Sequence, residues 1–339
     1  MAMCFERLLW NHPLSLLIEC LACSQVGGSM DATDEALVAL GNELLAGGYR
    51  FTAITPASHR RVLNRGDQSP ILESVFGWNR RFRRDAIDQK IFVLLEKAQQ
   101  LETDDGWFRS KVRFATIDDL IFLHSTFPTL SYDAVFFGPD TYRFARALRL
   151  ALADMTVAET FTLLDIGCGT GAGGLFAASQ LLPRQANIIL SDVNEKALRF
   201  SRINAILNGF PGAQTVQSDV FESLQGPADL IISNPPYLVD RHERPYCHGG
   251  GELGLALSLR IAQQSLDRLA PGGRLVLYTG TPIIAGTDAF FEAVRPALQS
   301  RDHRYSYEEI DPDVFGEELD TPAYERADRI AVVVLTVTN

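Results

Sequence analysis

Short apolar runs alternate with amphipathic stretches along the last two thirds of the chain. Apolar runs rich in Val, Ile and Leu predict buried strands, and apolar residues spaced three and four positions apart predict helices. Strands that alternate with helices predict an α/β fold, here a doubly wound, mostly parallel sheet of seven strands. The predicted strands are Phe161–Ile166, Asn187–Leu190, Gln214–Gln217, Asp229–Ser233, Arg274–Tyr278, Tyr305–Ile310 and Arg329–Thr338. The predicted helices are Pro139–Leu152, Ala172–Leu182, Glu195–Asn208, Leu257–Leu269 and Thr287–Leu298.

The first third has helices first and strands after them. Thr33 is the expected cap of a helix over Asp34–Ala46, because a threonine followed by acidic residues is typical of a helix start. Further helices are expected at 70–77 and 85–100, and strands at 107–114 and 120–124. Helices followed by a β-hairpin predict a winged-helix-like module. We therefore divide the chain into an extension at 1–30, a mainly helical, winged-helix-like domain at 31–130 and an α/β domain at 131–339.

The first 29 residues are expected to contribute little to the fold. Their apolar stretch, Leu14–Cys23, is interrupted by Glu19 and is shorter than the roughly 18 residues that a membrane span needs. Gly27-Gly28-Ser29 precedes Met30, which is a candidate for the natural start. Cys20 and Cys23 have zinc-knuckle spacing but lack a second pair, so no metal site is predicted. We expect a cytoplasmic protein without a membrane segment.

A glycine-rich turn follows the first predicted strand of the α/β domain. Asp165 ends the apolar run, and Gly167, Gly169 and Gly171 follow at alternate positions before a predicted helix. Glycine lets backbone N–H groups approach a ligand closely, and the helix start adds a partial positive charge. The pattern predicts a cofactor loop, although nicotinamide and flavin cofactors use similar turns.

The next three strands also end in polar residues. Asp192 follows the second strand, Asp219 and Val220 follow the third, and Asn234 follows the fourth. Open α/β sheets bind ligands at the carboxyl ends of their strands, and an acid after the second strand suits ribose hydroxyls. These residues therefore predict one ligand site along that edge of the sheet.

The motif Asp-Ile-Gly-Cys-Gly-Thr-Gly at 165–171, Asp192, Asp219 and Asn-Pro-Pro-Tyr at 234–237 together resemble a class I S-adenosylmethionine-dependent methyltransferase over residues 134–339. The resemblance implies a Rossmann-like sheet with an antiparallel last strand and S-adenosyl-L-methionine as cofactor. The residues that it implies for the cofactor are Phe137, Thr141, Asp165, Gly167, Gly169, Gly171, Asp192, Asp219, Val220 and Asn234. The catalytic residues that it implies are Asn234, Pro235, Pro236 and Tyr237.

Asn-Pro-Pro-Tyr is typical of enzymes that methylate planar nitrogens. The Asn234 side-chain carbonyl and the Pro235 backbone carbonyl can each accept an N–H of the acceptor group. The two prolines fix both φ angles, so these acceptors stay in place at a low entropic cost. Tyr237 is expected to stack on the acceptor.

Residues 243–255 resemble the loop of the glutamine-N5 methyltransferases that modify release factors, through Glu243, Pro245 and the glycines at 249, 250 and 254. This resemblance implies a protein glutamine amide as the substrate. Two departures separate the chain from that group: the first domain is larger and looks winged, and Tyr278-Thr279-Gly280 stands where those enzymes usually carry an acid. We expect the segment 238–254 to be a lid that orders over the substrate.

Charge is unevenly distributed in a chain with a net charge of −11. Residues 50–113 hold thirteen Lys and Arg against eight acids, whereas residues 114–339 hold seventeen against twenty-eight. The acidic α/β domain disfavours a broad electrostatic grip on nucleic acid, but the basic stretch Arg50–Arg113 leaves a nucleic-acid partner open. The clustered Arg80, Arg81, Arg83 and Arg84 fit either such a patch or, as we favour, pairing with the acidic domain.

Three other functions stay open from the sequence. An RNA or DNA base is also a planar nitrogen acceptor, and a duplex target has to be flipped out of its stack. A small-molecule acceptor is compatible with a winged dimerisation module. A cofactor-binding module without catalysis is disfavoured, since Asn234 and Asp219 are both present. The oligomeric state is not predicted.

Overall fold

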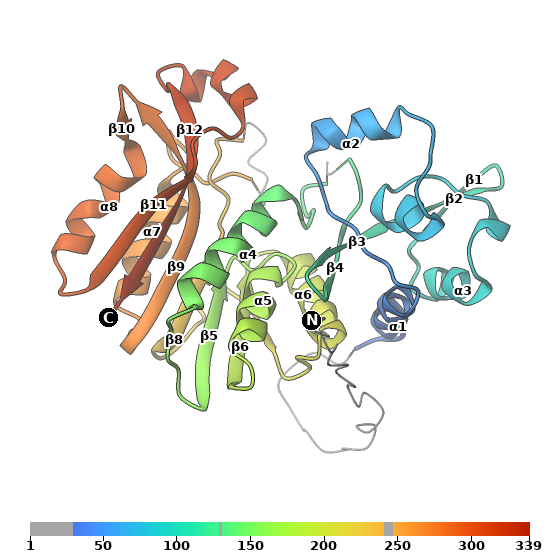
Figure 1. Cartoon of the computed structure of the whole chain (residues 1–339), viewed down its shortest axis with the longest axis horizontal. Helices are drawn as coiled ribbons and strands as arrows, with labels where there is room; N and C mark the ends of the chain where they lie inside the picture. The colour runs from blue at the N-terminus through green and yellow to red at the C-terminus, as the bar shows by residue number, and fades with distance from the viewer. Residues whose placement is uncertain (1–29, 129–130, 241–246) are drawn as a thin grey trace, which may run out of the picture.

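The computed structural model describes residues 30–128, 131–240 and 247–339 (Figure 1). The predictions for residues 1–29, including the Cys20–Cys23 pair and the start at Met30, therefore fall outside the described residues or at their edge. Glu243 and Pro245 also lie outside them, as does the middle of the expected lid.

A mixed sheet forms the centre of the α/β domain and confirms the predicted fold class. Its strand order is β11-β12-β9-β8-β5-β6-β7, and the short β10 pairs with the end of β9. β12 is antiparallel to both of its neighbours, as expected, while β5 through β9 run parallel to one another. The strands are β5 (Thr160–Ile166), β6 (Gln185–Asp192), β7 (Gln214–Gln217), β8 (Ala228–Ser233), β9 (Leu269–Ile284), β10 (Thr287–Asp288), β11 (Arg304–Asp311) and β12 (Arg329–Thr338).

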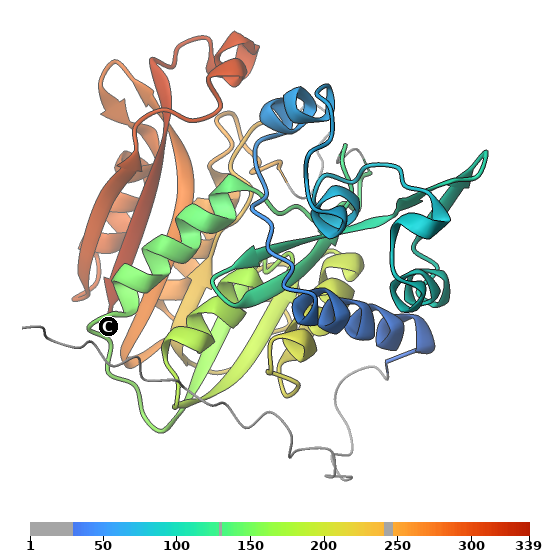
Figure 2. The ribbon, with the colours of Figure 1, turned by 45° about the vertical axis from the view of Figure 1, so that its right-hand side comes forward.

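Helices cover both faces of this sheet because its strands are apolar on both sides. Successive side chains of a strand point to opposite faces, and Leu163 and Leu164 of β5 accordingly lie in two different cores. The helices on one side are α4 (Pro139–Leu152), α5 (Ala172–Gln180) and α6 (Glu195–Leu207), and those on the other are α7 (Ala256–Leu266) and α8 (Ala289–Gln299). Figure 2 shows α4, α5 and α6 on the same side of the sheet.

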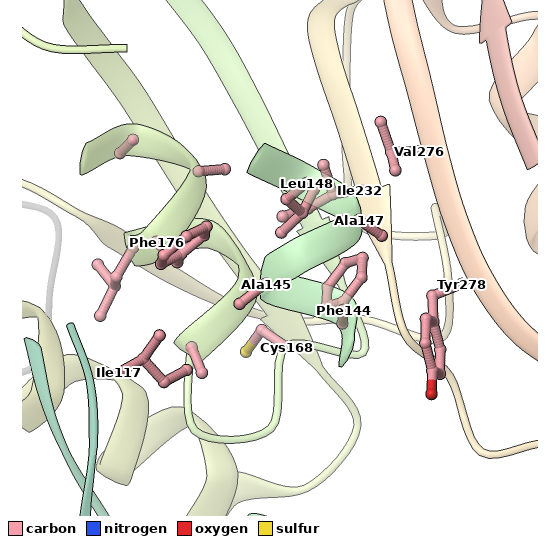
Figure 3. Close-up of a cluster of buried hydrophobic side chains, with 14 of the residues drawn as sticks. Ile117, Phe144, Ala145, Ala147, Leu148, Cys168, Phe176, Ile232, Val276 and Tyr278 are labelled. Atoms are coloured by element: carbon pink, nitrogen blue, oxygen red, sulfur yellow. The ribbon is translucent and has the colours of Figure 1, made fainter. Parts of the chain in front are cut away.

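The core on the α4 side joins the middle of the sheet to the first domain. Figure 3 shows Phe144 and Leu148 of α4 in one cluster with Phe176 of α5 and Ile232 of β8. Ile117 of the first domain reaches the same cluster. The start of α4 is therefore fixed by packing from several elements.

Helices and two hairpins make up the first domain. They are α1 (Ala32–Ala46), α2 (Pro56–Leu63), a π-helical turn (Glu73–Gly77), a 3-10 turn (Arg84–Ala86), α3 (Gln89–Lys97), the pair β1 (Leu101–Asp104) and β2 (Trp107–Ser110), and the pair β3 (Val112–Ile117) and β4 (Leu120–Ser125). The prediction of one strand over 107–114 is wrong, because the segment is divided between β2 and β3. The chain turns at Lys111, whose N–H donates to the Gln100 carbonyl. The helix α2 was not predicted at all.

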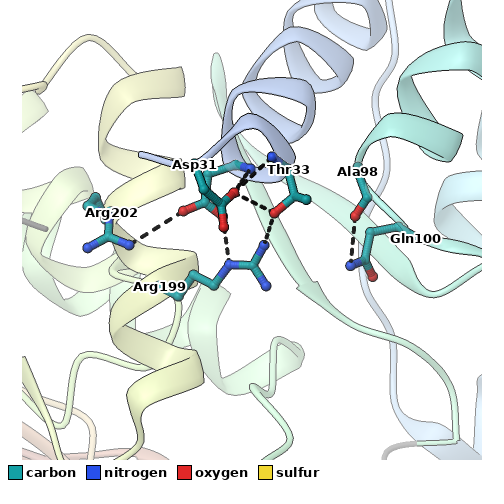
Figure 4. A network of polar contacts seen from close by, with 7 residues as sticks. Asp31, Thr33, Ala98, Gln100, Arg199 and Arg202 are labelled. Carbon is teal, nitrogen blue, oxygen red and sulfur yellow. Dashed lines mark hydrogen bonds and ion pairs between the residues drawn. The ribbon is translucent and has the colours of Figure 1, made fainter. Parts of the chain in front are cut away.

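The cap of α1 also differs from the prediction. The Asp31 carboxylate accepts the N–H groups of Thr33 and Asp34 at 2.8 and 2.9 Å, so Asp31 rather than Thr33 is the N-cap. The Thr33 hydroxyl instead accepts a hydrogen bond from Arg199 of α6 (Figure 4). Thr33 therefore joins α1 to α6, while Asp31 caps the helix.

Two asparagines of α6 attach the β3–β4 hairpin to the α/β domain. The Asn204 side-chain amide accepts the N–H of Leu123 at 2.7 Å and donates to the Leu123 carbonyl at 3.1 Å. Asn208 makes the same two hydrogen bonds with the backbone of Ile121. The asparagine side chains thereby satisfy strand β4 as a neighbouring strand would. Asn204 also donates to the Thr170 carbonyl at 2.9 Å, which ties this junction to the glycine-rich turn.

Candidate active site

A cavity of about 460 Å³ lies at the carboxyl ends of the parallel strands. Its walls come from the turns after β5, β6, β7 and β8, from the start of α4, from α7 and from Pro56 of α2. Of the predicted site residues, Phe137 and Gly171 do not line it. The residues that do are Thr141, Asp165, Gly167, Gly169, Asp192, Asp219, Val220, Asn234, Pro235, Pro236 and Tyr237.

The glycine-rich turn presents bare backbone to this cavity. Gly167 and Gly169 have φ angles of 69° and 54°, which side-chain-bearing residues rarely adopt. A Cβ atom at either position would meet no heavy atom within 4 Å, so the space in front of the turn is open. Gly171 has a different task, because it is the N-cap of α5 and packs near Ser201. The open backbone beside the first two glycines fits an extended ligand.

Two buried carboxylates, those of Asp165 and Asp192, accept hydrogen bonds from the backbone of the glycine-rich turn and the helix that follows it. Asp165 accepts the N–H of Gly174 at 2.7 Å, and burial raises its pKa to about 7. Asp192 accepts the N–H groups of Gly169 and Asn194, each at 2.9 Å, and burial raises its pKa as well. Asp192 therefore fixes the turn while it lines the cavity.

Asp219 is held by an arginine that the sequence analysis missed. Both guanidinium nitrogens of Arg260, on α7, bond the two carboxylate oxygens of Asp219. Val220, the next residue, is buried and has a φ of 53°, a strained conformation for a β-branched side chain. The bidentate pair and the strained valine together hold the turn after β7 against the cavity.

Asn234 ends β8 with its amide available to a ligand. Among the residues that the structure describes, its side chain makes no hydrogen bond, and it lines the cavity. Ser233, just before it, donates to the Ile166 carbonyl at 2.7 Å and so ties the ends of β8 and β5 together. Pro235 and Pro236 continue the turn without N–H groups. The amide is thus placed next to the glycine-rich turn by the sheet itself.

The ring of Tyr237 lies in the wall of the cavity with its hydroxyl engaged. The hydroxyl donates to Asp140 at 2.7 Å, the side chain is 6% exposed, and its ring packs against Gly280. Tyr278 donates to the other oxygen of Asp140 at 3.0 Å. Asp140 of α4 thus brings a carboxylate beside Tyr278 in the middle of β9, where the sequence has no acid. Tyr237 is an anchor of its loop, and its stacking on an acceptor stays a prediction.

Glycines of the segment after Asn-Pro-Pro-Tyr allow a close backbone contact. A Cβ on Gly254 would lie 2.3 Å from the Tyr237 carbonyl oxygen, and one on Gly249 would lie 1.9 Å from the Gly254 carbonyl oxygen. Gly249 donates to Leu238 at 2.8 Å, and Tyr324 accepts the Val239 N–H at 3.0 Å. The described parts of the expected lid, 238–240 and 247–254, therefore pack against the Asn-Pro-Pro-Tyr turn, and some of their residues also line the cavity.

Phe137 and Thr141, the two predicted residues near the start of α4, are placed differently. Thr141 lines the cavity, and its hydroxyl accepts the Gly138 N–H at 3.3 Å. Phe137 is buried and stacks on Phe122 and His124, with ring centroids 5.6 and 5.4 Å apart. Its neighbour Phe136, 37% exposed, lines the cavity instead.

The four clustered arginines are used inside the first domain. Arg81 pairs with Asp104 at 2.8 Å, Arg83 lies over the Trp107 ring, and Arg84 lies over the Phe92 ring. Arg80 donates to three carbonyls at the end of α2, those of residues 62, 63 and 65. These contacts support the interpretation that the four arginines pair within the protein. The expected partners were wrong, because the arginines contact residues of their own domain and not of the acidic α/β domain.

Neither a metal cluster nor a membrane span emerges from the described chain. Within residues 30–128, 131–240 and 247–339, no group of three or more His, Cys, Asp or Glu could hold a metal ion. The same residues contain no helix that is both long and apolar enough to cross a bilayer.

The comparisons with known proteins agree on methyl transfer. Residues 141–287 match the family model of the methyltransferase small domain. A release factor glutamine methyltransferase of Deinococcus radiodurans is 33% identical over 171 residues, which cover 46% of this chain and 60% of that protein. A ribosomal RNA small subunit methyltransferase C of Cronobacter sakazakii is 30% identical over 182 residues, 53% of this chain and 45% of that protein. A release factor glutamine methyltransferase of Lactococcus lactis is 24% identical over 237 residues, 63% of this chain and 78% of that protein.

These relatives differ in the acceptor that their names state, and the matches cover 60% and 45% of the lengths of the first two. The matched family segment runs from Thr141 to Thr287 and contains the glycine-rich turn, both buried carboxylates and Asn234. The geometry of that segment agrees with the cofactor predicted from the sequence, since open glycine backbone and Asp192 lie on one cavity. This segment therefore resembles a methyltransferase small domain in both its sequence and the geometry of its site.

Proposed function

We propose that the chain transfers the methyl group of S-adenosylmethionine to a planar nitrogen, and that this nitrogen belongs to a glutamine amide of a protein. The observation that carries the proposal is the free amide of Asn234, which lines the same cavity as Gly167 and Gly169. An amide nitrogen shares its lone pair with the carbonyl, so the protein must hold both N–H groups while the nitrogen attacks. Asn234 and the backbone carbonyl of Pro235 are the two acceptors for this task.

The chain's own residues supply position, since the cofactor brings the reactive methyl on a sulfonium. Asp192 and the open backbone of Gly167 and Gly169 would bind the nucleoside part of the cofactor. Asp165, buried beneath the turn, is suited to a cationic amine because burial strengthens such a pairing. The two prolines keep the acceptors of the nitrogen at fixed angles. A preorganised pair of reactants is a large part of the acceleration in such displacements.

The glutamine acceptor rests on the loop that contains Gly249 and Gly254. Its glycines match those of the release-factor enzymes, and they allow the backbone approach to Tyr237 that sets the position of the Asn-Pro-Pro turn. The acidic balance of residues 114–339 also favours a protein over nucleic acid. An RNA base is the second candidate, because a relative named for ribosomal RNA methylation is 30% identical to this chain over 182 residues.

Labelled methyl transfer into a cell extract separates these acceptors. We expect radiolabel from S-adenosylmethionine in the protein fraction, and N5-methylglutamine after enzymatic digestion of that fraction. A signal in RNA that is lost after ribonuclease treatment would favour the second candidate. Calorimetry with S-adenosylhomocysteine tests the cofactor alone, so a missing acceptor is distinguished from a protein that does not bind the cofactor.

A further inference from the structure

The helix α2 joins the active-site cavity to a group of unpaired arginines. Pro56, the first residue of α2, lines the cavity with Asn234. Arg60 lies one turn further along the same helix, because residues four apart share a helix face. Arg61 and Arg65 follow it, and all three side chains are exposed. We call Arg60, Arg61 and Arg65 the α2 arginine surface.

These arginines have no acidic partner, and among the described residues their side chains make no hydrogen bond or ring contact, in contrast to the four clustered arginines described above. Within the part of the chain that the structure describes, none of the three forms an ion pair, whereas Arg50 pairs with Asp119 and Arg81 with Asp104. The segment from 50 to 66 contains no Asp or Glu. Three positive charges are therefore left in water on and just after a helix whose first residue lines the active-site cavity.

The surface is held rigidly in place. His59 of α2 is buried, and its Nε2 atom lies 3.0 Å from the Trp78 carbonyl. Its ring stacks on Phe127 with centroids 4.3 Å apart, and burial lowers its pKa to about 4, so this side chain is a neutral anchor. Arg80 donates to carbonyls at the other end of the helix. These contacts fix the backbone of α2 and of Arg65, so the three arginines project from defined positions on the surface.

We propose that the α2 arginine surface docks an acidic segment of the protein substrate, close in sequence to the glutamine that enters the cavity. This inference rests on the proposed function and adds a recognition element to it. The guanidinium groups are planar forks that bind carboxylates through two hydrogen bonds. One helical turn is about 5.4 Å long, a distance that an extended peptide covers in about two residues. Acids a few residues from the glutamine can therefore reach the surface.

Nucleic acid fits this surface less well than an acidic peptide does. A protein that grips a phosphate backbone commonly makes about six to ten phosphate contacts, and the α2 arginine surface supplies three charges. Single-stranded RNA also binds through stacked aromatic rings, but Phe51, the one aromatic residue in the segment 50–66, is buried. Residues 114–339, which include the neighbouring α/β domain, hold seventeen Lys and Arg against twenty-eight acids, a balance that repels a long polyanion.

Peptide binding tests the proposal without requiring turnover. Two fluorescent peptides share a central glutamine, and one carries glutamates a few residues away where the other carries serines. In the presence of S-adenosylhomocysteine, we expect the full chain to bind the acidic peptide about tenfold more tightly than the serine peptide. The difference should shrink between about 50 and 300 mM salt, because exposed charge pairs are screened.

A pair of triple variants locates the effect. R60A/R61A/R65A should abolish the preference for the acidic peptide while leaving the affinity for S-adenosylhomocysteine unchanged. R146A/R304A/R326A is the matched control, because it removes the same charge from exposed, unpaired arginines of the α/β domain and should keep the preference. Equal binding of both peptides, or equal losses in the two triple variants, would overturn the proposal.

Two further outcomes separate this inference from the proposed function. A short uridine oligonucleotide that binds more tightly than the acidic peptide, through the same three arginines, would overturn the peptide assignment in favour of RNA. Tight, arginine-dependent binding of the acidic peptide without methylation of any glutamine would support the docking surface and count against the glutamine acceptor.

Discussion

The hydroxyl of Tyr237 donates a hydrogen bond to Asp140 across 97 residues of sequence, at 2.7 Å. The other oxygen of the same carboxylate accepts from Tyr278 and from Arg143, each at 3.0 Å. Asp140 belongs to the first turn of α4, which is packed against the centre of the sheet. The hydrogen bond from Tyr237 therefore ties the turn that contains Asn234 to a charged group on α4.

Tyr237→Phe removes this hydrogen bond and leaves the ring in place. A hydrogen bond to a charged group contributes about 1.5–3 kcal/mol, so we expect the free energy of unfolding to fall by about that amount. Turnover should fall as well, because the Asn-Pro-Pro turn loses its anchor. Chemical denaturation and initial methylation rates measure the two effects.

Tyr278→Phe is the matched control for this change. It removes a bond to the same carboxylate from β9, outside the Asn-Pro-Pro turn, so it should lower stability similarly and affect turnover much less. Equal turnover in Tyr237→Phe and the wild type would show that the anchor does not govern the acceptor site.

Asn234→Ala should separate binding from catalysis. The side chain has no hydrogen bond to the described part of the protein, so its removal should leave the fold and the affinity for S-adenosylhomocysteine near normal. Turnover should drop by roughly 2–4 kcal/mol in activation free energy, the range seen for preorganised polar contacts. Calorimetry and single-turnover kinetics give the two numbers, and a normal rate constant in the variant would remove Asn234 from the mechanism.

Gly254→Ala places a methyl group where the backbone of Tyr237 already lies. The new Cβ would sit 2.3 Å from the Tyr237 carbonyl oxygen, in a residue with a φ of 76°. The loop must move to relieve this contact, so both stability and turnover should decrease strongly. Thermal unfolding and methylation rates provide the measurements.

Gly251→Ala tests whether the contact or the backbone angle causes the loss. Gly251 has a similar φ of 72°, but its Cβ would meet nothing closer than 3.4 Å. This variant should show only the cost of the left-handed conformation, about 1–2 kcal/mol, with near-normal turnover per folded molecule. Equal losses of turnover in the two variants would contradict a specific role for the contact with Tyr237.

The strands of the sheet were predictable because their apolar runs end in turn residues. The bounds of β7 and β12 agree with the sequence-based ranges, and the buried β5 and β8 differ by one residue each. The helix α2 was missed because its eight residues, PASHRRVL, contain few apolar positions. The Thr55-Pro56 pair before it is nevertheless a helix-start signal, with a capping threonine and a proline at the first position.

The site was predictable only in the part that is local in sequence. The glycine-rich turn and Asn234 follow their strands directly, so a motif describes them. Asp140 and Arg260 act through contacts with residues 97 and 41 positions away, and no local pattern reports such pairings. For the same reason the sequence could not show which of the many arginines of the first domain are already paired.

Asn204→Ala should loosen the junction between the two domains. Its amide is fully buried and satisfies both backbone groups of Leu123 and the carbonyl of Thr170. Each buried polar group left without a partner costs about 1–3 kcal/mol, so the variant should lose several kcal/mol of stability. Asn208→Ala, a half-buried counterpart that bonds Ile121, should lose less. Denaturant titrations compare the two, and a smaller loss in Asn204→Ala would contradict this account.

Asp165 should make the stability of the protein fall as pH rises. Burial raises the pKa of this carboxyl from 3.8 to about 7, so between these values the folded protein holds a proton that the unfolded chain has lost. Stability then decreases as the pH rises from about 4 to about 7, by up to about 4 kcal/mol, and levels off above that range. Asp165→Asn keeps an oxygen for the Gly174 N–H but cannot ionise, so the decrease should be smaller in its profile, with only the part due to Asp192 left. Urea titrations at several pH values compare the two proteins, and parallel profiles would mean that the carboxyl is already ionised at low pH.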